Sequence, residues 1–273
     1  MSEMNLDQIR EHWKKWATDF GTDIRATTKT STAKEIELGN LIRVLDRLIK
    51  NNTGIINVLE AGCGNGHNLF MLAKSFPNVN FDGFDYIEEM ITNSNKTKSK
   101  MNLQNIDFFY GDLLEPAKSD SKYDIIFTVR ALINLSSDEL QGAAIANLSH
   151  KLKQNGHLVI LENTVNNFAK QNKARNRVGL PSRNPSEFNH FINEKYLESA
   201  FLDNGLTLIE KIDFMGLHDL ILYVLLPKIN GGVIDYDSPL VLAATELTLS
   251  MSQSENQQFE NFGQNRMFIC QKI

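Results

Sequence analysis

Cysteine is scarce in this sequence. Cys63 and Cys270 are its two cysteines, and they lie far apart along the chain. A structural disulfide is therefore not expected, and a reducing, cytoplasmic compartment is the simpler interpretation. The N-terminal residues, Met-Ser-Glu-Met-Asn, are polar and lack the apolar core of a signal peptide.

Long apolar runs and an excess of positive charge are also missing. The longest apolar run, around residues 220–226, is far too short to span a bilayer, so we expect no membrane partner. The 28 Lys and Arg residues are outnumbered by 33 Asp and Glu residues, which gives a formal net charge of −5. Dedicated nucleic-acid binders are usually basic, so this balance argues against a nucleic-acid partner.

An alternation of apolar runs and helical patterns occupies the middle of the 273 residues. Continuous apolar strands separated by helices predict a parallel sheet covered on both faces, and thus an α/β fold. The expected strands are residues 55–60, 79–84, 106–110, 123–129 and 157–161. The expected helices between them are residues 67–76, 87–98 and 136–152, the last with a capping box formed by Ser136 and Glu139.

Two amphipathic helices are expected before this core. Residues 5–20 place four apolar side chains on one helical face, namely Ile9, Trp13, Trp16 and Phe20. A second helix is expected to carry Leu38, Leu41, Leu45 and Leu48 on one face and to end at residues 51–54. Residues 1–54 are therefore predicted to form an N-terminal helical lid, although the first helix also fits a simple role in the core.

The rest of the chain divides into the core and two further parts of one domain. Residues 55–162 form the predicted cofactor-binding core, and residues 163–235 form an acceptor-side insertion that includes a helix at 194–203 and a sixth strand at 206–214. Residues 236–273 supply a helix at 240–249 and a last strand at 266–271, which complete the domain. The apolar run at 217–226 fits a lid, a core segment or the surface of a homodimer.

A glycine-rich turn follows the first core strand. The strand ends at Glu60, three glycines follow as Gly62, Gly64 and Gly66, and a helical pattern begins at His67. Glycine accepts positive φ and has no Cβ to hold a ligand away, and the helix start offers free amide donors. This turn predicts a seat for a nucleotide-like cofactor at the edge of a parallel sheet.

Acidic residues at the strand ends indicate which cofactor is bound. Asp85 ends the second strand, where a carboxylate accepts hydrogen bonds from ribose hydroxyls. Asp112 follows the third strand and can accept from an exocyclic amine, with Ile87 and Leu113 on the two faces of an adenine ring. Glu60 would repel the diphosphate of a dinucleotide but suits the ammonium of an amino acid.

The ordered set of Glu60-Ala-Gly-Cys-Gly-Asn-Gly66, Asp85 and Gly111-Asp112 resembles the motifs of class I S-adenosylmethionine-dependent methyltransferases over residues 55–162. The resemblance implies a Rossmann-like seven-stranded sheet of order 3-2-1-4-5-7-6, with the last strand antiparallel. It also implies that the glycine turn lies beside the methionine moiety, Asp85 holds the ribose and Asp112 holds the adenine amine. The predicted cofactor-binding residues are Glu60, Gly62, Cys63, Gly64, Asn65, Gly66, Asp85, Tyr86, Ile87, Asp112, Leu113 and Arg130.

Catalytic residues are harder to assign. Placing the acceptor in line with the methyl group accelerates transfer, and a general base is needed only for a protonated acceptor. We select Arg130 and Glu162, at the ends of adjacent strands, and His190 as the first choice of base because of its pKa range. Asn134 and His218 are further candidates, and either histidine also fits a purely structural role. No metal-binding carboxylate set is evident.

The acceptor itself is predicted only by class. Thr128-Val-Arg-Ala stands where enzymes that methylate planar amino groups carry Asn/Asp-Pro-Pro-Tyr/Phe, which disfavours adenine and glutamine. A basic run either forms a solvated helix face or clamps an anionic acceptor together with Arg25 and Lys29. This run comprises Lys170, Lys173, Arg175, Arg177 and Arg183.

We therefore predict methyl transfer from S-adenosyl-L-methionine to a small molecule, at a hydroxyl or an amine. A NAD-dependent oxidoreductase on a Rossmann fold is the first alternative, and Glu60 disfavours it. A protein or RNA methyltransferase and a non-catalytic module that kept the cofactor fold are the others.

Overall fold

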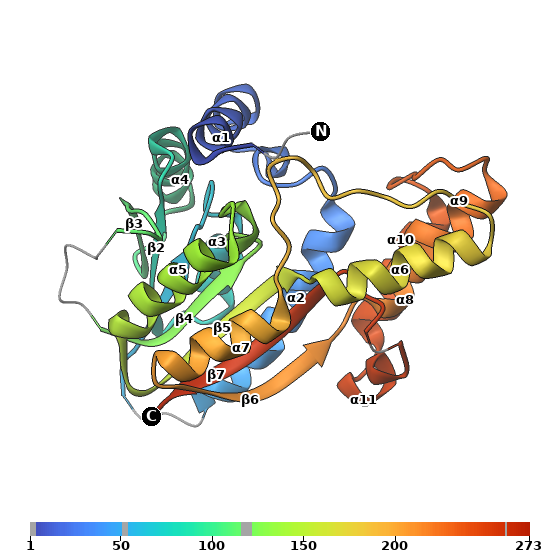
Figure 1. Cartoon of the computed structure of the whole chain (residues 1–273). Helices are drawn as coiled ribbons and strands as arrows, with labels where there is room; N and C mark the ends of the chain where they lie inside the picture. Colours follow the sequence, from blue (N-terminus) through green and yellow to red (C-terminus); the bar gives the residue numbers. More distant parts are fainter. Residues whose placement is uncertain (1–3, 51–53, 116–121, 260) are drawn as a thin grey trace.

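The computed structural model describes residues 4–50, 54–115, 122–259 and 261–273, and it is built around one seven-stranded sheet (Figure 1). The strand order is β3-β2-β1-β4-β5-β7-β6, which confirms the predicted order. The strands are β1 (Ile56–Ala61), β2 (Val79–Asp85), β3 (Ile106–Tyr110), β4 (Tyr123–Val129), β5 (Leu152–Asn163), β6 (Leu206–Asp213) and β7 (Asn265–Lys272). β1 to β5 pair in parallel, whereas β7 is antiparallel to both β5 and β6.

The strand order reverses between β1 and β4, and this reversal determines where a ligand can bind. β1 pairs with β2 on one side and with β4 on the other, so the connections that leave their carboxyl ends diverge. In open α/β sheets the ligand binds in the crevice at this point. The carboxyl ends of β1, β2 and β4 carry Glu60, Asp85 and Arg130 within or just after them.

Helices bury both faces of the sheet because successive strand residues point to opposite sides. Val58 faces α2 (Ser31–Lys50) and α3 (His67–Ser75), whereas the adjacent Leu59 faces α5 (Asp138–Lys151) and α7 (Glu194–Asp203). Ile125 and Ile126 of β4 divide in the same way between the two clusters. The apolar strands are thus buried on both sides, as their continuous sequence pattern predicts.

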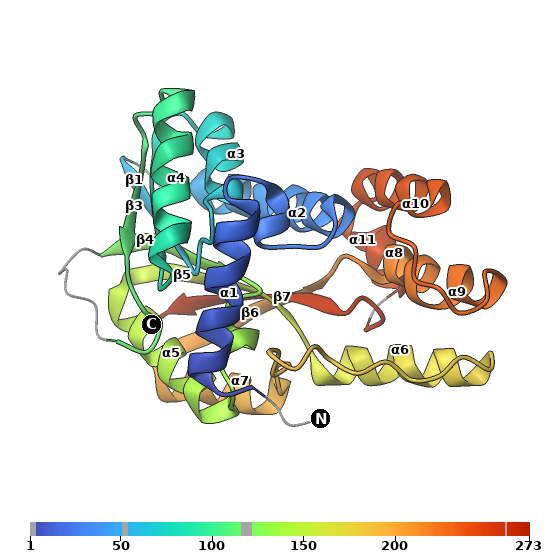
Figure 2. The same ribbon diagram turned by 90° about the horizontal axis from the view of Figure 1, so that it is seen from above.

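The N-terminal helix lies across the carboxyl edge of the sheet. α1 (Leu6–Phe20) begins with a capping box, in which Asn5 accepts from the Gln8 amide and Gln8 accepts from the Asn5 amide, each at 3.0 Å. It packs beside α4 (Glu88–Met101), as Figures 1 and 2 show. A short turn, η1 (Ile24–Ala26), connects α1 to α2.

A helical lobe projects beyond the carboxyl ends of β5 and β6 (Figure 2). It contains α6 (Val165–Arg177), α8 (Gly216–Leu220), the π-helical turn η3 (Ile221–Leu225), α9 (Leu226–Ile229) and α10 (Pro239–Ser250), and it is followed by α11 (Gln253–Asn256) and η4 (Gln257–Phe259). Residues 178–193 then return from the far end of α6 to α7. The predicted polar insertion after β5 is therefore one amphipathic helix followed by an extended return segment. No helix within the described ranges is long and apolar enough to cross a membrane.

Three predicted boundaries differ from the structure or fall outside it. The cap of α5 is Ser137 rather than Ser136, and its side chain accepts from the Leu140 amide at 3.3 Å. β5 begins at Leu152 rather than near residue 157, because Leu152 pairs with Tyr123 beyond a register shift in β4. The stop predicted at residues 51–54 lies mostly outside the described residues, and α2 extends to Lys50.

Candidate functional site

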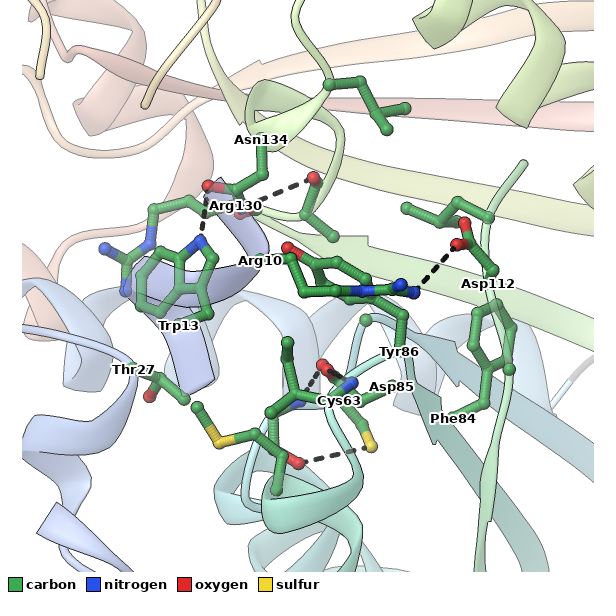
Figure 3. A pocket seen from close by; sticks show the side chains of 18 of the residues that line it. Arg10, Trp13, Thr27, Cys63, Phe84, Asp85, Tyr86, Asp112, Arg130 and Asn134 are labelled. Carbon is green, nitrogen blue, oxygen red and sulfur yellow. Dashed lines mark hydrogen bonds and ion pairs between the residues drawn. The ribbon is translucent and has the colours of Figure 1, made fainter. Parts of the chain in front are cut away.

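A cavity of about 260 Å³ lies at the carboxyl ends of β1, β2, β3 and β4, below α1 and beside α2 (Figure 3). All of the predicted cofactor residues except Asn65 and Gly66 line it. Side chains that the sequence pattern did not select also line it, and among them are Arg10, Trp13, Thr27 and Lys34. The cavity therefore joins the ends of the strands to the two N-terminal helices.

The glycine turn forms the wall at the end of β1. The amides of Gly62 and Cys63 both donate to the Phe84 carbonyl at 2.9 Å, which ties the turn to the end of β2. Gly62 has φ of +75°, and a Cβ there would lie 2.6 Å from the Cβ of Ala131. Asn65 lies outside the lining and donates to the carbonyls of Gly21 and Asp23, at 3.2 and 2.8 Å. It therefore fastens the N-terminal segment to the turn.

Two carboxylates mark the end of the cavity near β2 and β3. Asp85 accepts hydrogen bonds from the amides of Gly64, at 2.9 Å, and Ile87, at 3.0 Å, and burial raises its pKa to about 6. Asp112 accepts from the Leu114 amide at 2.9 Å. Ile87 is buried and lines the same cavity, so an apolar wall lies next to both carboxylates.

Glu60 is a buried carboxylate with one unused oxygen. Its Oε1 accepts from the Asn68 amide group at 2.6 Å, whereas its Oε2 is buried without a hydrogen-bond partner in the described part of the chain. Burial raises the pKa of Glu60. A buried polar atom normally has a partner, so this oxygen is available to accept a hydrogen bond from a ligand.

Arg130 lies on the side of the cavity away from Asp112 (Figure 3), in a left-handed backbone conformation. Its φ is +53°, and its amide donates to the Leu161 carbonyl at 2.9 Å. Its Nε lies 3.0 Å from Oε1 of Glu37, and this same oxygen accepts from Nδ2 of Asn265 at 2.8 Å. The guanidinium is thus ion-paired to α2 beside the cavity.

Glu162 does not line the cavity. It is fully buried, and its carboxylate accepts from the amides of Ala131 at 2.9 Å, Leu132 at 2.8 Å and Ile133 at 3.4 Å. Burial raises its pKa to about 8. This geometry orients the turn η2 (Leu132–Asn134) that follows Arg130.

Neither candidate histidine lies in the cavity lining. His190 places Nε2 2.9 Å from Asp138 of α5, while its amide donates to the Ile133 carbonyl at 2.7 Å. His218 is buried in α8 with Nδ1 3.0 Å from Asp219. In this structure the two rings contact α5 and the interior of the lobe.

Two members of the basic run also turn away from the cavity. Arg175 is buried and donates to the carbonyls of Pro181 and Tyr223. The guanidinium of Arg183 lies 3.6 Å from the centre of the Tyr223 ring. Both therefore hold the return segment and the lobe together. Arg25, from the N-terminal loop, is paired with Asp23 at 2.9 Å.

Three segments meet near Arg130. Nε1 of Trp13 donates to Oδ1 of Asn134 at 3.1 Å, and Nδ2 of Asn134 donates to the Arg130 carbonyl at 2.9 Å (Figure 3). The Phe188 ring packs edge-on against Trp13 at 5.5 Å and stacks on His12 at 4.3 Å. Helix α1, the loop after β4 and the return segment thus enclose one end of the cavity.

Comparison with known proteins identifies the family. A family model for a methyltransferase domain matches residues 53–201. The malonyl-[acyl-carrier protein] O-methyltransferase of Bacillus anthracis is 32% identical over 44% of this chain and 42% of the relative. The protein-L-isoaspartate O-methyltransferase of Aliivibrio fischeri (strain ES114) is 30% identical over 38% of this chain and 45% of the relative. These matches span less than half of either relative.

A solved structure shares the fold along the whole chain. It is the magnesium protoporphyrin IX methyltransferase from Synechocystis PCC 6803 with bound SAH, with a TM-score of 0.59 and 15% identity, and the alignment covers 98% of this chain and 100% of that chain. The residues present here fit the cofactor of such enzymes, because the cavity offers an unused carboxylate oxygen at Glu60 and further carboxylates at Asp85 and Asp112. The chain therefore belongs to the methyltransferase-domain family, and its sheet has the strand order of the class I fold.

Proposed function

We propose that this chain transfers the methyl group of S-adenosyl-L-methionine to a small-molecule acceptor, at a hydroxyl or an amine. One observation carries the proposal: Glu60, Asp85 and Asp112 line a single cavity at the ends of β1, β2 and β3. Glu60 would accept from the ammonium of the cofactor, Asp85 from the ribose hydroxyls and Asp112 from the adenine amine. Ile87 and Leu113 would cover the two faces of the base.

The end of the cavity near Arg130 and Trp13 is the proposed acceptor side. When bound, the cofactor supplies an electrophilic methyl group on a sulfonium. Transfer of this methyl group to an acceptor would convert the cofactor to the thioether S-adenosylhomocysteine, and a protonated acceptor would release its proton to water or to a base. Much of the rate would come from holding the acceptor in line, which the loop after β4 and the Trp13 ring can do.

The hydrogen bonds of Glu162 and His190 determine the roles that we propose for these two residues. Glu162 holds the amides of the loop at residues 131–133, so it would position the acceptor side without touching the reacting atoms. His190 stays a predicted base, and its ring would have to leave Asp138 to reach the cavity. The variant His190→Gln tests this role, because unchanged turnover with the natural acceptor would remove it.

Oxygen is the preferred acceptor atom. The names of the Bacillus anthracis and Aliivibrio fischeri relatives both specify O-methyl transfer, which supports oxygen over nitrogen. The same names specify acceptors on a carrier protein or a protein, so a protein-bound acceptor is the second candidate function. An anionic acceptor and a homodimer remain predictions of the sequence.

A labelled-methyl transfer assay tests the proposed function. The full chain is incubated with S-adenosyl-L-methionine that carries a labelled methyl group and with a cell extract separated into small molecules and macromolecules. We expect a labelled small molecule, identified by mass, in the first fraction. Label confined to protein or RNA would contradict the small-molecule acceptor but not methyl transfer itself.

A further inference from the structure

Besides the carboxylate of Glu60, the lysine Lys34 lines the cavity. Lys34 belongs to α2 and is only 6% exposed. Within the described residues its ammonium forms no hydrogen bond and no ion pair within 4.0 Å, although Glu37 and Glu60 act on it electrostatically. Buried charges are normally paired. An unpaired ammonium at Lys34 and an unused carboxylate oxygen at Glu60 in the same cavity therefore indicate a ligand that carries one negative and one positive group.

The position of Lys34 is fixed by the packing of α2. It lies four residues before Leu38 and so continues the apolar stripe that Leu41 and Leu45 extend toward the sheet. These buried leucines anchor the helix, which keeps the lysine in the wall of the cavity rather than in solvent. Burial lowers the pKa of Lys34, and nearby carboxylates oppose this effect.

The other cation at this end of the cavity is already neutralised. Arg130 places Nε 3.0 Å from Glu37, whose side chain also accepts from Asn265. An anionic group in the cavity would have to compete with Glu37 for Arg130, whereas Lys34 has no such close partner among the described residues. Lys34 is therefore the better receptor for a carboxylate.

We propose that Lys34 binds the α-carboxylate of the cofactor while Glu60 binds its α-ammonium, so that together they select ligands with an intact amino-acid end. This inference rests on the proposed function of the cavity. Lys34 would then determine specificity: it favours S-adenosylhomocysteine over analogues that keep the adenosine and the sulfur but lack the carboxylate. Asp85 and Asp112 would bind both kinds of ligand equally.

Calorimetry with ligand analogues tests this role. The wild-type chain and Lys34→Met are titrated with S-adenosylhomocysteine and with 5′-methylthioadenosine, which lacks the amino-acid end. A charge-assisted hydrogen bond corresponds to a change in affinity of about 10- to 100-fold, so Lys34→Met should weaken S-adenosylhomocysteine by this factor. The affinity for 5′-methylthioadenosine should change by less than about twofold, and Lys34→Arg should keep part of the preference.

Lys50→Met is the matched control, because Lys50 is an exposed lysine of the same helix, α2, outside the cavity lining. It should leave both affinities unchanged. A wild-type comparison that depends on no variant uses the analogue of S-adenosylhomocysteine in which the carboxylate is replaced by hydrogen, and this analogue should bind at least about tenfold more weakly.

Two results would overturn the inference in distinguishable ways. If the wild-type chain binds S-adenosylhomocysteine and Lys34→Met binds it equally well, Lys34 has no role at the carboxylate, while the proposed function stands. If the wild-type chain does not bind S-adenosylhomocysteine at all, the proposed function fails and this inference fails with it.

Discussion

The guanidinium of Arg10 reaches from α1 into the cavity and places Nη2 3.8 Å from Oδ2 of Asp112 (Figure 3). The same group lies 5.2 Å from the centre of the Tyr86 ring and donates to the Tyr110 hydroxyl at 3.3 Å. Asp112 is the residue that we propose to accept from the adenine amine. Arg10 and the base would therefore compete for one carboxylate, and α1 would have to adjust when the cofactor binds.

Replacing Arg10 with Met is expected to strengthen binding of S-adenosylhomocysteine by about two- to fivefold. The ion pair is partly exposed, and such pairs contribute up to about 1 kcal/mol, so its loss makes Asp112 available at little cost to the fold. Calorimetry measures the change. Lys14→Met is the control, because Lys14 lies on the same helix as Arg10 and pairs with Glu89 of α4 outside the cavity lining. Weaker binding by Arg10→Met would show that Arg10 instead holds the base by stacking.

Replacing Gly62 with Ala should destabilise the protein through a steric contact. The new Cβ would lie 2.6 Å from the Cβ of Ala131, in a residue with φ of +75°. Gly231 has φ of +76° and open space around it, so Gly231→Ala reports the backbone cost alone. We expect Gly231→Ala to lower the free energy of unfolding by about 1–2 kcal/mol. Gly62→Ala should lower it by about 1–3 kcal/mol more than that. Equal losses in urea unfolding would contradict the contact.

Protonation of Asp85 should weaken cofactor binding in mild acid. Burial raises the pKa of this carboxyl from 3.8 to about 6 in the folded chain, and only the ionised form accepts freely from two ribose hydroxyls. The Kd of S-adenosylhomocysteine should therefore rise as pH falls through 6, with about a tenfold contribution from Asp85 at pH 5. Calorimetry between pH 5 and 7.5 measures the slope, and Asp85→Asn should lose this part of it.

The same shift has a consequence for stability. Because the folded pKa of Asp85 lies above the unfolded value, the folded chain holds the proton more strongly between about pH 4 and pH 6. The contribution of Asp85 to the free energy of unfolding thus falls as pH rises through this window, by up to about 3 kcal/mol. Comparing the free energies of unfolding of wild type and Asp85→Asn at each pH measures this contribution. A contribution that rises with pH would contradict the raised pKa of Asp85.

Glu162 offers a test that separates positioning from proton transfer. Glu162→Ala would leave the amides of residues 131–133 without their acceptor, and each buried unsatisfied amide costs about 1–3 kcal/mol. Glu162→Gln keeps one oxygen for the amides of Ala131 and Leu132, so most of the stability and turnover should remain. If Glu162 were a general base, Glu162→Gln would reduce turnover by about 100-fold or more at nearly unchanged stability. Thermal unfolding and initial rates distinguish the two.

The individual strands and the acidic residues of the cavity could be predicted because their signals are local, whereas the strand order follows from the family resemblance. A continuous apolar run ending in Glu60 and followed by alternate glycines defines one strand and its turn, and Asp85 ends the next strand in the same way. The carboxyl ends of neighbouring parallel strands meet at one edge, so their side chains meet as well. The family model and the observed strand order confirm the family and the sheet.

The contribution of the N-terminal helices could not be predicted with the same sharpness. Lys34 does carry a signal, because it occupies an apolar-stripe position of α2, but only the packing of α2 shows that it lines the same cavity as Glu60. Arg10 carries no such signal, since its place in the cavity depends on how α1 crosses the sheet edge. His190 and Glu162 follow from their places in the sequence, yet hydrogen bonds with Asp138 and with the loop after β4 set their orientation.

Calorimetry that compares binding of S-adenosylhomocysteine and of NAD to the full chain decides which cofactor the cavity holds. We predict stoichiometric binding of S-adenosylhomocysteine and, for NAD, an affinity at least about 100-fold weaker, because Glu60 would face its diphosphate. Equal or tighter binding of NAD, or no binding of S-adenosylhomocysteine, would contradict the account.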